Sequence, residues 1–169
     1  MVQTGASSGT IFDLSELSDT QQKWARGVLS GNCDYDWGKL VSGLDGRKVK
    51  VQIGEPPARA MFYPRGPRVV IHRYYFQSER AEASRLLAWE SAHAIDFYAL
   101  SEDQREDVTR AFHDGRLYDH GWLDGPYEEQ TGEAFMEGFI AAFCPSLAAD
   151  STFSHVTTPD IAQEIREIL

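Results

Sequence analysis

Cysteine and long apolar runs are both scarce in this chain of 169 residues. No apolar run approaches the roughly 20 residues that cross a bilayer, and the small, polar N-terminal residues do not resemble a signal peptide. We therefore expect no membrane segment and a cytoplasmic location. Cys33 and Cys144 are far apart and lack CxxC spacing, which favours buried thiols in a reducing compartment; a single structural disulfide bond is the alternative.

Basic residues are also few. The chain has 16 Lys and Arg against 26 Asp and Glu, which gives a net charge of -10. This charge repels phosphate backbones and anionic lipids, so we expect neither nucleic acid nor a membrane as a partner. The hydrophobic fraction of 42% is enough to fill a core. We expect a Gly- and Ser-rich flexible leader over residues 1–11 and a single domain over residues 12–169.

Helical and alternating patterns follow one another along the chain and predict an α+β fold. Ser18 and Gln21 have the spacing of a capping box, which predicts a helix behind them. Alternating apolar residues over 49–53 predict a strand. The Pro-Arg-Gly-Pro turn between residues 60–63 and 68–72 predicts a hairpin at the edge of a small, mostly antiparallel sheet. Further helices are expected over residues 35–44, 78–100, 101–113, 131–143 and 158–169.

The stretch from Leu86 to Phe97 places ionisable groups inside an apolar helical run. At 100° per residue, Glu90 and His93 fall on the same stripe of the helix as Leu86 and Phe97. Burial of a carboxylate and an imidazole costs several kcal/mol unless each group has a partner. The pair is therefore either a structural hydrogen-bonded pair in the core or a part of a functional site.

A later helical stretch, residues 131–143, carries Glu133 and Glu137 one turn apart. A zinc hydrolase needs three protein ligands, an open position for water and a carboxylate that takes the proton of this water. Ligands four residues apart on a helix can reach one ion, and the residue after the first ligand then lies near the bound water. Glu90 and His93, followed by Glu133 and Glu137, have the order of such a site.

Residues 89–96, Trp-Glu-Ser-Ala-His-Ala-Ile-Asp, resemble the HExxHxxD helix of the short gluzincin-like zincin metallopeptidases. The resemblance covers roughly residues 47–145, including the strands before this helix and the ExFxE pattern that begins at Glu133. It implies a zincin-like fold in which a small sheet with an edge hairpin packs on a long motif helix, followed by a second, Glu-bearing helix. The site residues that it implies are Glu90 as general base, His93 and Glu133 as zinc ligands, and Asp96 and Glu137 beside them.

Trp89 stands where this family has its first zinc ligand. An indole has no lone pair for a metal, because its only polar atom is an N–H donor. His93 and Glu133 alone bind zinc weakly, so a working site needs a third ligand from another element. His120, in the aromatic loop before Glu133, is the best candidate. With this ligand the chain is a metal-dependent peptidase with a reorganised zinc site.

Without a metal, the same side chains form a buried hydrogen-bonded cluster that holds two helices in register. The cleft beside them does not depend on the ion, and extended peptides commonly add to an exposed sheet edge. We therefore expect a non-catalytic zincin-like homologue without a cofactor, whose partner is a peptide or a protein. The active peptidase is the alternative. A third interpretation, with Glu90 and Glu133 as the acid and base of a glycoside hydrolase, has no further support.

Overall fold

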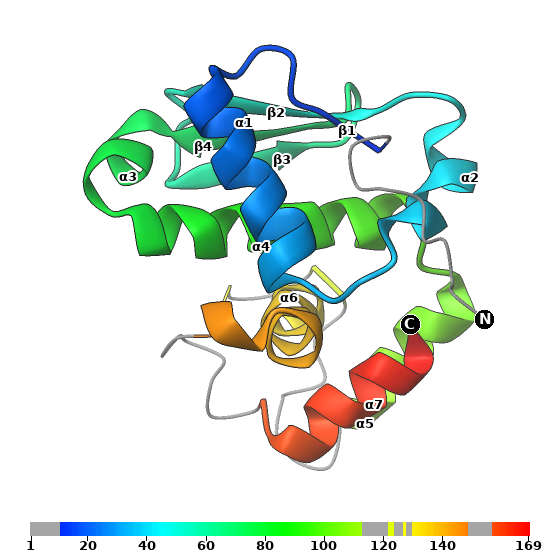
Figure 1. Ribbon diagram of the computed structural model, residues 1–169. Helices are drawn as coiled ribbons and strands as arrows, with labels where there is room; N and C mark the ends of the chain where they lie inside the picture. Colours follow the sequence, from blue (N-terminus) through cyan, green and yellow to red (C-terminus); the bar gives the residue numbers. More distant parts are fainter. Residues whose placement is uncertain (1–10, 113–121, 124–126, 128–129, 149–156) are drawn as a thin grey trace, which may run out of the picture. The chain divides into compact units, whose positions relative to one another are not determined.

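The structure, a computed structural model, describes residues 11–112, 122–123, 127, 130–148 and 157–169, and it divides into two compact units (Figure 1). The first unit extends to Ala99 and the second begins at Leu100. Residues 1–10 of the expected leader lie outside the described residues, and the single domain expected over residues 12–169 stays a prediction. In the described part of the chain, no helix is long and apolar enough to span a membrane.

A sheet of four strands lies at the centre of the first unit, as far as the described residues extend. Together with the helices of both units, this sheet makes the protein an α+β protein, as predicted. The strands, in their order across the sheet, are β1 (Phe12–Asp13), β2 (Val49–Gly54), β4 (Arg68–His72) and β3 (Ala60–Tyr63).

Two of the three strand pairings in this sheet are parallel, so the prediction of a mostly antiparallel sheet is wrong. Strand β2 runs parallel to both β1 and β4, whereas β3 and β4 pair antiparallel. The hairpin has the predicted bounds, but β4 rather than β3 lies beside β2. After β2 the chain first forms β3, leaving one strand position between them, and then returns to form β4 in the gap between β2 and β3. Local alternation of residues does not encode this order. Strand β3 is therefore at the edge of the sheet, as predicted (Figure 1).

Alternation along β2 sorts its side chains between the two faces of the sheet. Val49 and Val51 are fully buried, while Lys50 between them is exposed. Strand β1 adds a short parallel pairing in which Phe12, also buried, lies opposite Val49. The sequence does not predict β1, because a two-residue strand is too short for a period to stand out from the Gly- and Ser-rich stretch before it.

Helix α1 (Asp19–Arg26) begins with the predicted capping box. The Gln21 backbone N–H donates to the Ser18 hydroxyl, and the Ser18 N–H donates to the Gln21 side-chain oxygen at 2.8 Å. This exchange satisfies two donors that the helix itself cannot pair. The helix continues as a π-helical segment, Gly27–Asn32.

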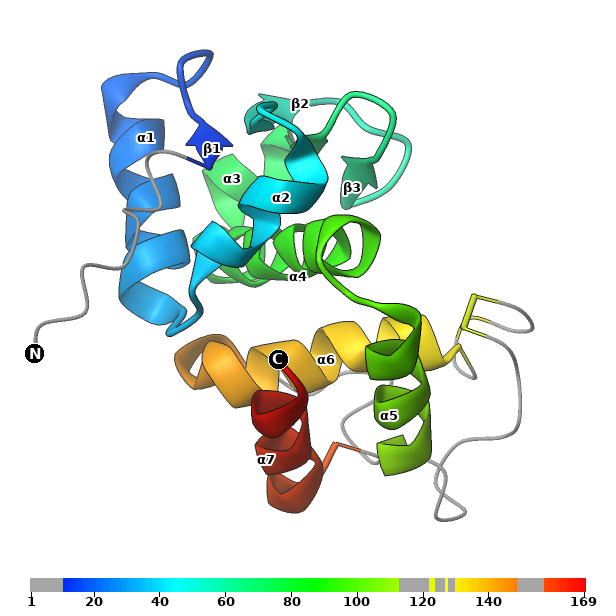
Figure 2. The same ribbon diagram turned by 90° about the vertical axis from the view of Figure 1, so that its right-hand side faces the viewer.

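The long helix predicted over residues 78–100 is confirmed to within two residues at each end, and a short helix that was not predicted precedes it. Helix α3 (Arg73–Ser78) follows β4 directly, and the imidazole of His72 caps it by accepting the Tyr74 N–H at 3.1 Å. Helix α4 (Arg80–Tyr98) begins after Glu79, whose φ of -136° interrupts the helical conformation. Helix α4 packs against β3 and β4, so the hairpin is held on the motif helix as predicted (Figures 1 and 2).

The helix predicted over residues 35–44 is shorter than expected. It consists of a 3₁₀ turn, Trp37–Leu40, and helix α2 (Val41–Leu44), which ends at Asp45 with a φ of 51°. Gly43 lies directly against the end of α4, because a Cβ added to it would be 1.8 Å from the Tyr98 carbonyl oxygen. Only glycine permits this close approach.

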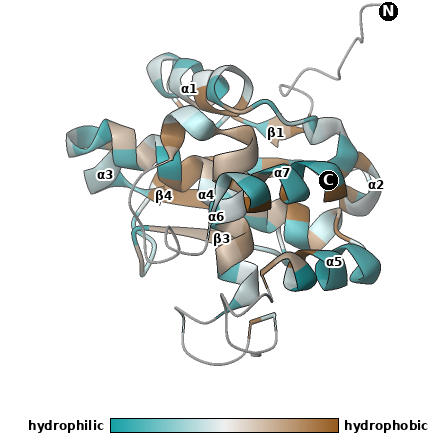
Figure 3. Cartoon of the chain, turned by 90° about the horizontal axis from the view of Figure 1, so that it is seen from below, coloured by the Kyte–Doolittle hydropathy of each residue, from teal (hydrophilic) through white to brown (hydrophobic). Residues whose placement is uncertain are grey.

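The described part of the second unit contains three α-helices: α5 (Glu102–Phe112), α6 (Thr131–Phe143) and α7 (Pro159–Ile168). Their bounds match the predicted ranges closely. The three helices contact one another (Figure 2), and Gly138 on α6 lies against Phe112 of α5 and Ile165 of α7. Helix α5 is hydrophilic over most of its surface, as its charged sequence indicates (Figure 3).

The two cysteines differ from the prediction. Cys33 and Cys144 are both disulfide-bonded and nearly or fully buried. The expectation of two thiols is therefore wrong. It rested on sequence spacing, and spacing does not determine how close a sulfur atom comes to another in the folded chain.

Candidate functional site

Helix α4 carries four of the predicted site residues: Trp89, Glu90, His93 and Asp96. Eleven of its 19 residues are buried, so these polar groups lie in a largely apolar environment. The Ala and Leu residues around them favour the helix. Along the predicted stripe Glu90 is only 8% exposed, whereas Phe97 near the helix end is 53% exposed. The predicted carboxylate and imidazole are therefore on one helix, and Phe97, the apolar residue at the end of their stripe, is exposed to solvent.

Trp89, which the resemblance to zincins aligns with the first metal ligand, has a buried ring. Its side chain is 6% exposed, and the guanidinium carbon of Arg85 lies 4.8 Å from the ring centroid. This distance is that of a cation–π contact. Neither an indole nor a guanidinium donates a lone pair to a metal, and the positive charge of Arg85 opposes a divalent cation beside it. The donor set at this position does not fit zinc.

Next to Glu90, the Ser91 hydroxyl is fully buried and has no hydrogen-bond partner among the described residues. A buried hydroxyl without a partner costs about 1–3 kcal/mol. The motif stretch therefore contains a polar group that contributes nothing to stability through hydrogen bonding.

His93 has a strongly lowered pKa. Burial disfavours the imidazolium and is the larger cause, while the negative charge of Asp96 acts in the opposite direction; the resulting pKa is about 4 instead of 6.5. Asp96 is itself buried. His93 is therefore neutral at pH 7, and a neutral imidazole has one nitrogen that accepts a hydrogen bond.

The two glutamates of the predicted second helix lie on α6, in the second unit. Glu133 is in the first turn of α6, and Glu137 follows one turn later and is buried. His120, the candidate third ligand, lies outside the described residues. Within the part of the chain that the structure describes, no three His, Cys, Asp or Glu side chains form a group that could hold a metal ion. The convergence of Glu90, His93 and Glu133 stays a prediction.

An aromatic cluster joins the edge hairpin to the end of α4. The ring of Phe62 on β3 lies 6.0 Å from that of Phe97 and 6.3 Å from that of Tyr98, centroid to centroid. The Tyr98 hydroxyl donates to the carbonyl oxygen of Pro64 in the hairpin turn. The edge strand and its turn are therefore fixed to the same helix that carries the motif.

The backbone of β3 has one open side. The His72 N–H donates to the Arg59 carbonyl at 2.9 Å, which makes these two residues a hydrogen-bonded pair of the antiparallel ladder. Because such pairs alternate, Ala60 and Phe62 direct their N–H and C=O groups away from β4. No strand among the described residues covers this side. Ala60 is only 6% exposed, whereas Phe62 is half-buried, so the edge can accept another extended segment at Phe62.

The sequence contained a signal for one of the contacts that we did not predict. Arg85 precedes Trp89 by four residues, a spacing that places the two side chains on one face of a helix. The cluster of Phe62, Phe97 and Tyr98 had no such local signal, because Phe62 is far from the other two in the sequence.

Comparisons of the chain with protein-family models, with curated proteins and with solved structures find no match. The resemblance to zincins therefore depends on the motif residues 89–96, the Glu-bearing stretch 133–137 and the order of the elements around them.

Proposed function

We propose that this chain is a degenerate zincin-like protein that binds an extended peptide along β3 and does not cleave it. The observation that carries the proposal is the open edge of β3 at Phe62, which is half-buried and presents unpaired backbone groups beside the motif helix. Addition of a peptide strand to such an edge is a common mode of recognition, in which main-chain hydrogen bonds supply affinity.

The order of the elements also supports this proposal. An edge hairpin leads through the short helix α3 into a long helix with a Glu-Ser-Ala-His stretch, and the resemblance to zincins implies a hairpin before such a helix. The hairpin is held on this helix by the contacts of Phe62 and Tyr98, and none of these contacts involves the positions of the metal ligands. Loss of the metal therefore leaves the peptide-binding edge intact.

The absence of cleavage is inferred from Trp89. A water nucleophile at neutral pH needs a metal or another means of activation, and the first ligand position holds a buried ring under Arg85. Glu90 remains as a candidate general base, but it lacks the activated water on which a base of this kind acts.

Peptide addition is tested with N-methylated peptides. The probe is a fluorescein-labelled nine-residue peptide with a Thr-Val-Thr centre and Gln residues on both sides, and binding is measured by fluorescence polarisation. An added strand uses the N–H groups of every second residue, so N-methylation of one alternate set should abolish binding while methylation of the other set preserves it. Equal binding of both methylated forms would show that the peptide does not add as a strand.

The absence of cleavage is tested separately, with the same peptide and mass spectrometry. We expect no products with the protein alone or with added zinc. Zinc-dependent cleavage that disappears in Glu90→Gln would overturn this part of the proposal and favour the active peptidase, and Glu79→Gln, at the start of α4, serves as the control.

A further inference from the structure

The hairpin belongs to a basic segment within an acidic protein. Residues 47–73 contain seven Lys and Arg and one acidic residue, which leaves nine basic and 25 acidic residues for the rest of the chain. The local charge around the β3 edge therefore has the opposite sign to the net charge of -10. An edge strand with this charge does not select partners by backbone hydrogen bonds alone.

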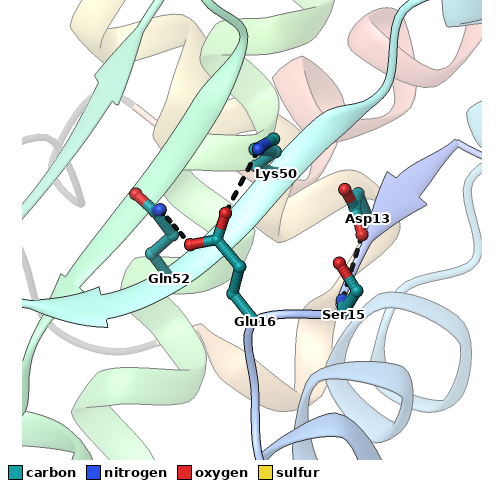
Figure 4. Close-up of polar contacts among 5 residues, drawn as sticks. All are labelled: Asp13, Ser15, Glu16, Lys50 and Gln52. Atoms are coloured by element: carbon teal, nitrogen blue, oxygen red, sulfur yellow. Dashed lines mark hydrogen bonds and ion pairs between the residues drawn. The ribbon is translucent and has the colours of Figure 1, made fainter.

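Some of these basic residues are neutralised within the first unit. Lys50 on β2 pairs with Glu16, with 3.1 Å between Nζ and Oε1, and Gln52 donates to the other carboxylate oxygen of Glu16 (Figure 4). These hydrogen bonds, from Gln52 first and then from Lys50, lower the pKa of Glu16. At the start of β3, Arg59 pairs with Glu82 at 3.4 Å.

Three other cations near the hairpin turn form no ion pair with any described residue: Arg47, Arg65 and Arg68. All three are exposed. We call these three residues the cationic surface. Its charges lie at one end of β3, whereas the charged residue at the other end, Arg59, is already paired.

Aromatic rings hold two members of the cationic surface beside the edge strand. The guanidinium carbon of Arg68 lies 4.4 Å from the ring centroid of Tyr63, the last residue of β3. That of Arg47 lies 5.5 Å from the ring of Tyr98, whose hydroxyl bonds the hairpin turn. The Nε–H of Arg47 donates to the Leu44 carbonyl at 3.0 Å. Stacking keeps a guanidinium in place while its other N–H donors remain available to a carboxylate.

We propose that the segment that binds β3 is an acidic peptide, with its carboxylates on the cationic surface. This inference rests on the proposed function and specifies the partner class. Arginine recognises carboxylates through paired N–H donors. The three guanidinium groups at this end of the edge form no ion pair with a described residue and can supply such donors. A basic peptide meets like charges at the same place.

A nucleic acid would also meet these cations, but two observations favour the peptide. The rest of the chain carries a large excess of acidic residues, which repels a long polyanion. The open N–H and C=O groups of Phe62 match a peptide backbone, and a phosphate backbone has no donor for the carbonyl group.

The test uses three fluorescein-labelled peptides with the same Thr-Val-Thr centre, flanked on each side by Glu, by Gln or by Lys. We expect the Glu peptide to bind best, the Lys peptide worst, and the affinity for the Glu peptide to fall as salt is raised. The double substitution R65Q/R68Q should lower the affinity for the Glu peptide by about tenfold and leave the affinity for the Gln peptide nearly unchanged. The matched control, K23Q/R26Q on α1, removes the same charge elsewhere and should have little effect.

Each other outcome decides a different point. If the Glu and Gln peptides bind alike and R65Q/R68Q changes neither, the acidic partner is excluded while peptide addition stands. If none of the three peptides binds folded protein, the proposed function itself fails. A twelve-nucleotide oligothymidylate could displace the Glu peptide at a lower concentration than unlabelled Glu peptide does. In that case the cationic surface binds phosphate groups in preference to carboxylates, and the inference is overturned. Circular dichroism of both double variants establishes that they are folded.

Discussion

The guanidinium of Arg85 lies over the indole of Trp89, 4.8 Å from the ring centroid, one helical turn before the Glu-Ser-Ala-His stretch. In the proposed resemblance to zincins, Trp89 aligns with the first metal ligand. Where a zincin has a metal and a lone-pair donor, this chain has a cation and an aromatic face.

Restoring the ligand should restore metal binding if the inferred geometry is correct. We expect Trp89→His to bind about one zinc ion per chain while the wild type binds none, because His93 and Glu133 then have a third partner. The smaller side chain should lower the free energy of unfolding by about 2–4 kcal/mol. Bound zinc should restore part of this loss. Metal analysis and thermal unfolding with and without zinc measure both effects.

Trp89→Phe is the control for this substitution, since it keeps a ring and supplies no ligand. It should gain no zinc. A folded Trp89→His variant without zinc affinity would count against the convergence of His93 and Glu133.

The lowered pKa of His93 predicts a stability that falls in mild acid. Between its folded value of about 4 and its ordinary value of 6.5, the unfolded chain binds a proton that the folded chain does not. This stability is fully present above pH 6.5 and is lost as the pH falls towards 4, at up to about 1.4 kcal/mol per pH unit. Urea unfolding from pH 4.5 to 7.5 measures the slope.

Other ionisable groups also titrate in this range. The pH dependence of the unfolding free energy is therefore compared with that of His93→Gln, whose side chain does not titrate. The wild type should show the steeper dependence of unfolding free energy on pH. Parallel curves for the two proteins would mean that His93 is not desolvated.

Gly43 should tolerate no side chain. Because an added Cβ would lie 1.8 Å from the Tyr98 carbonyl oxygen, we expect Gly43→Ala to lower the free energy of unfolding by about 2 kcal/mol or more. At Gly27 the backbone is helical and nothing lies within 4 Å of an added Cβ. Gly27→Ala should therefore be neutral or stabilising by about 0.5 kcal/mol. Equal urea midpoints for the two variants would contradict the close contact between α2 and α4.

The thiol content distinguishes the structure from the sequence-based prediction. In the denatured, unreduced chain we expect no reactive thiol, and after reduction we expect both Cys33 and Cys144 to react with a thiol reagent. The variant Cys33→Ser/Cys144→Ser should be less stable than the oxidised wild type by about 2–4 kcal/mol. Two reactive thiols before reduction would restore the original prediction.

Local patterns predicted the elements but not their pairing. The capping residue Ser18 placed the start of α1 correctly, because a cap is a property of a few neighbouring residues. Alternation and turn residues likewise placed β2 and the hairpin. The parallel alignment of β2 and β4 depends on where the hairpin docks, and no residue in either strand encodes that.

In the candidate site, too, local features could be predicted from the sequence and long-range contacts could not. The positions of Glu90 and His93 on one helical stripe followed from their spacing alone. The lowered pKa of His93 depends on burial, and the contact of Phe62 with Tyr98 joins residues far apart in the chain. Neither could be predicted without the fold.

The arginines at the end of the edge strand also bear on self-association. An open edge strand is a template for the same strand of another copy, and such pairing leads to aggregation. Two copies aligned in parallel at β3 would bring Arg65 and Arg68 of each molecule together, and their repulsion would oppose the contact. The same charges therefore disfavour a parallel pairing of two copies at this edge.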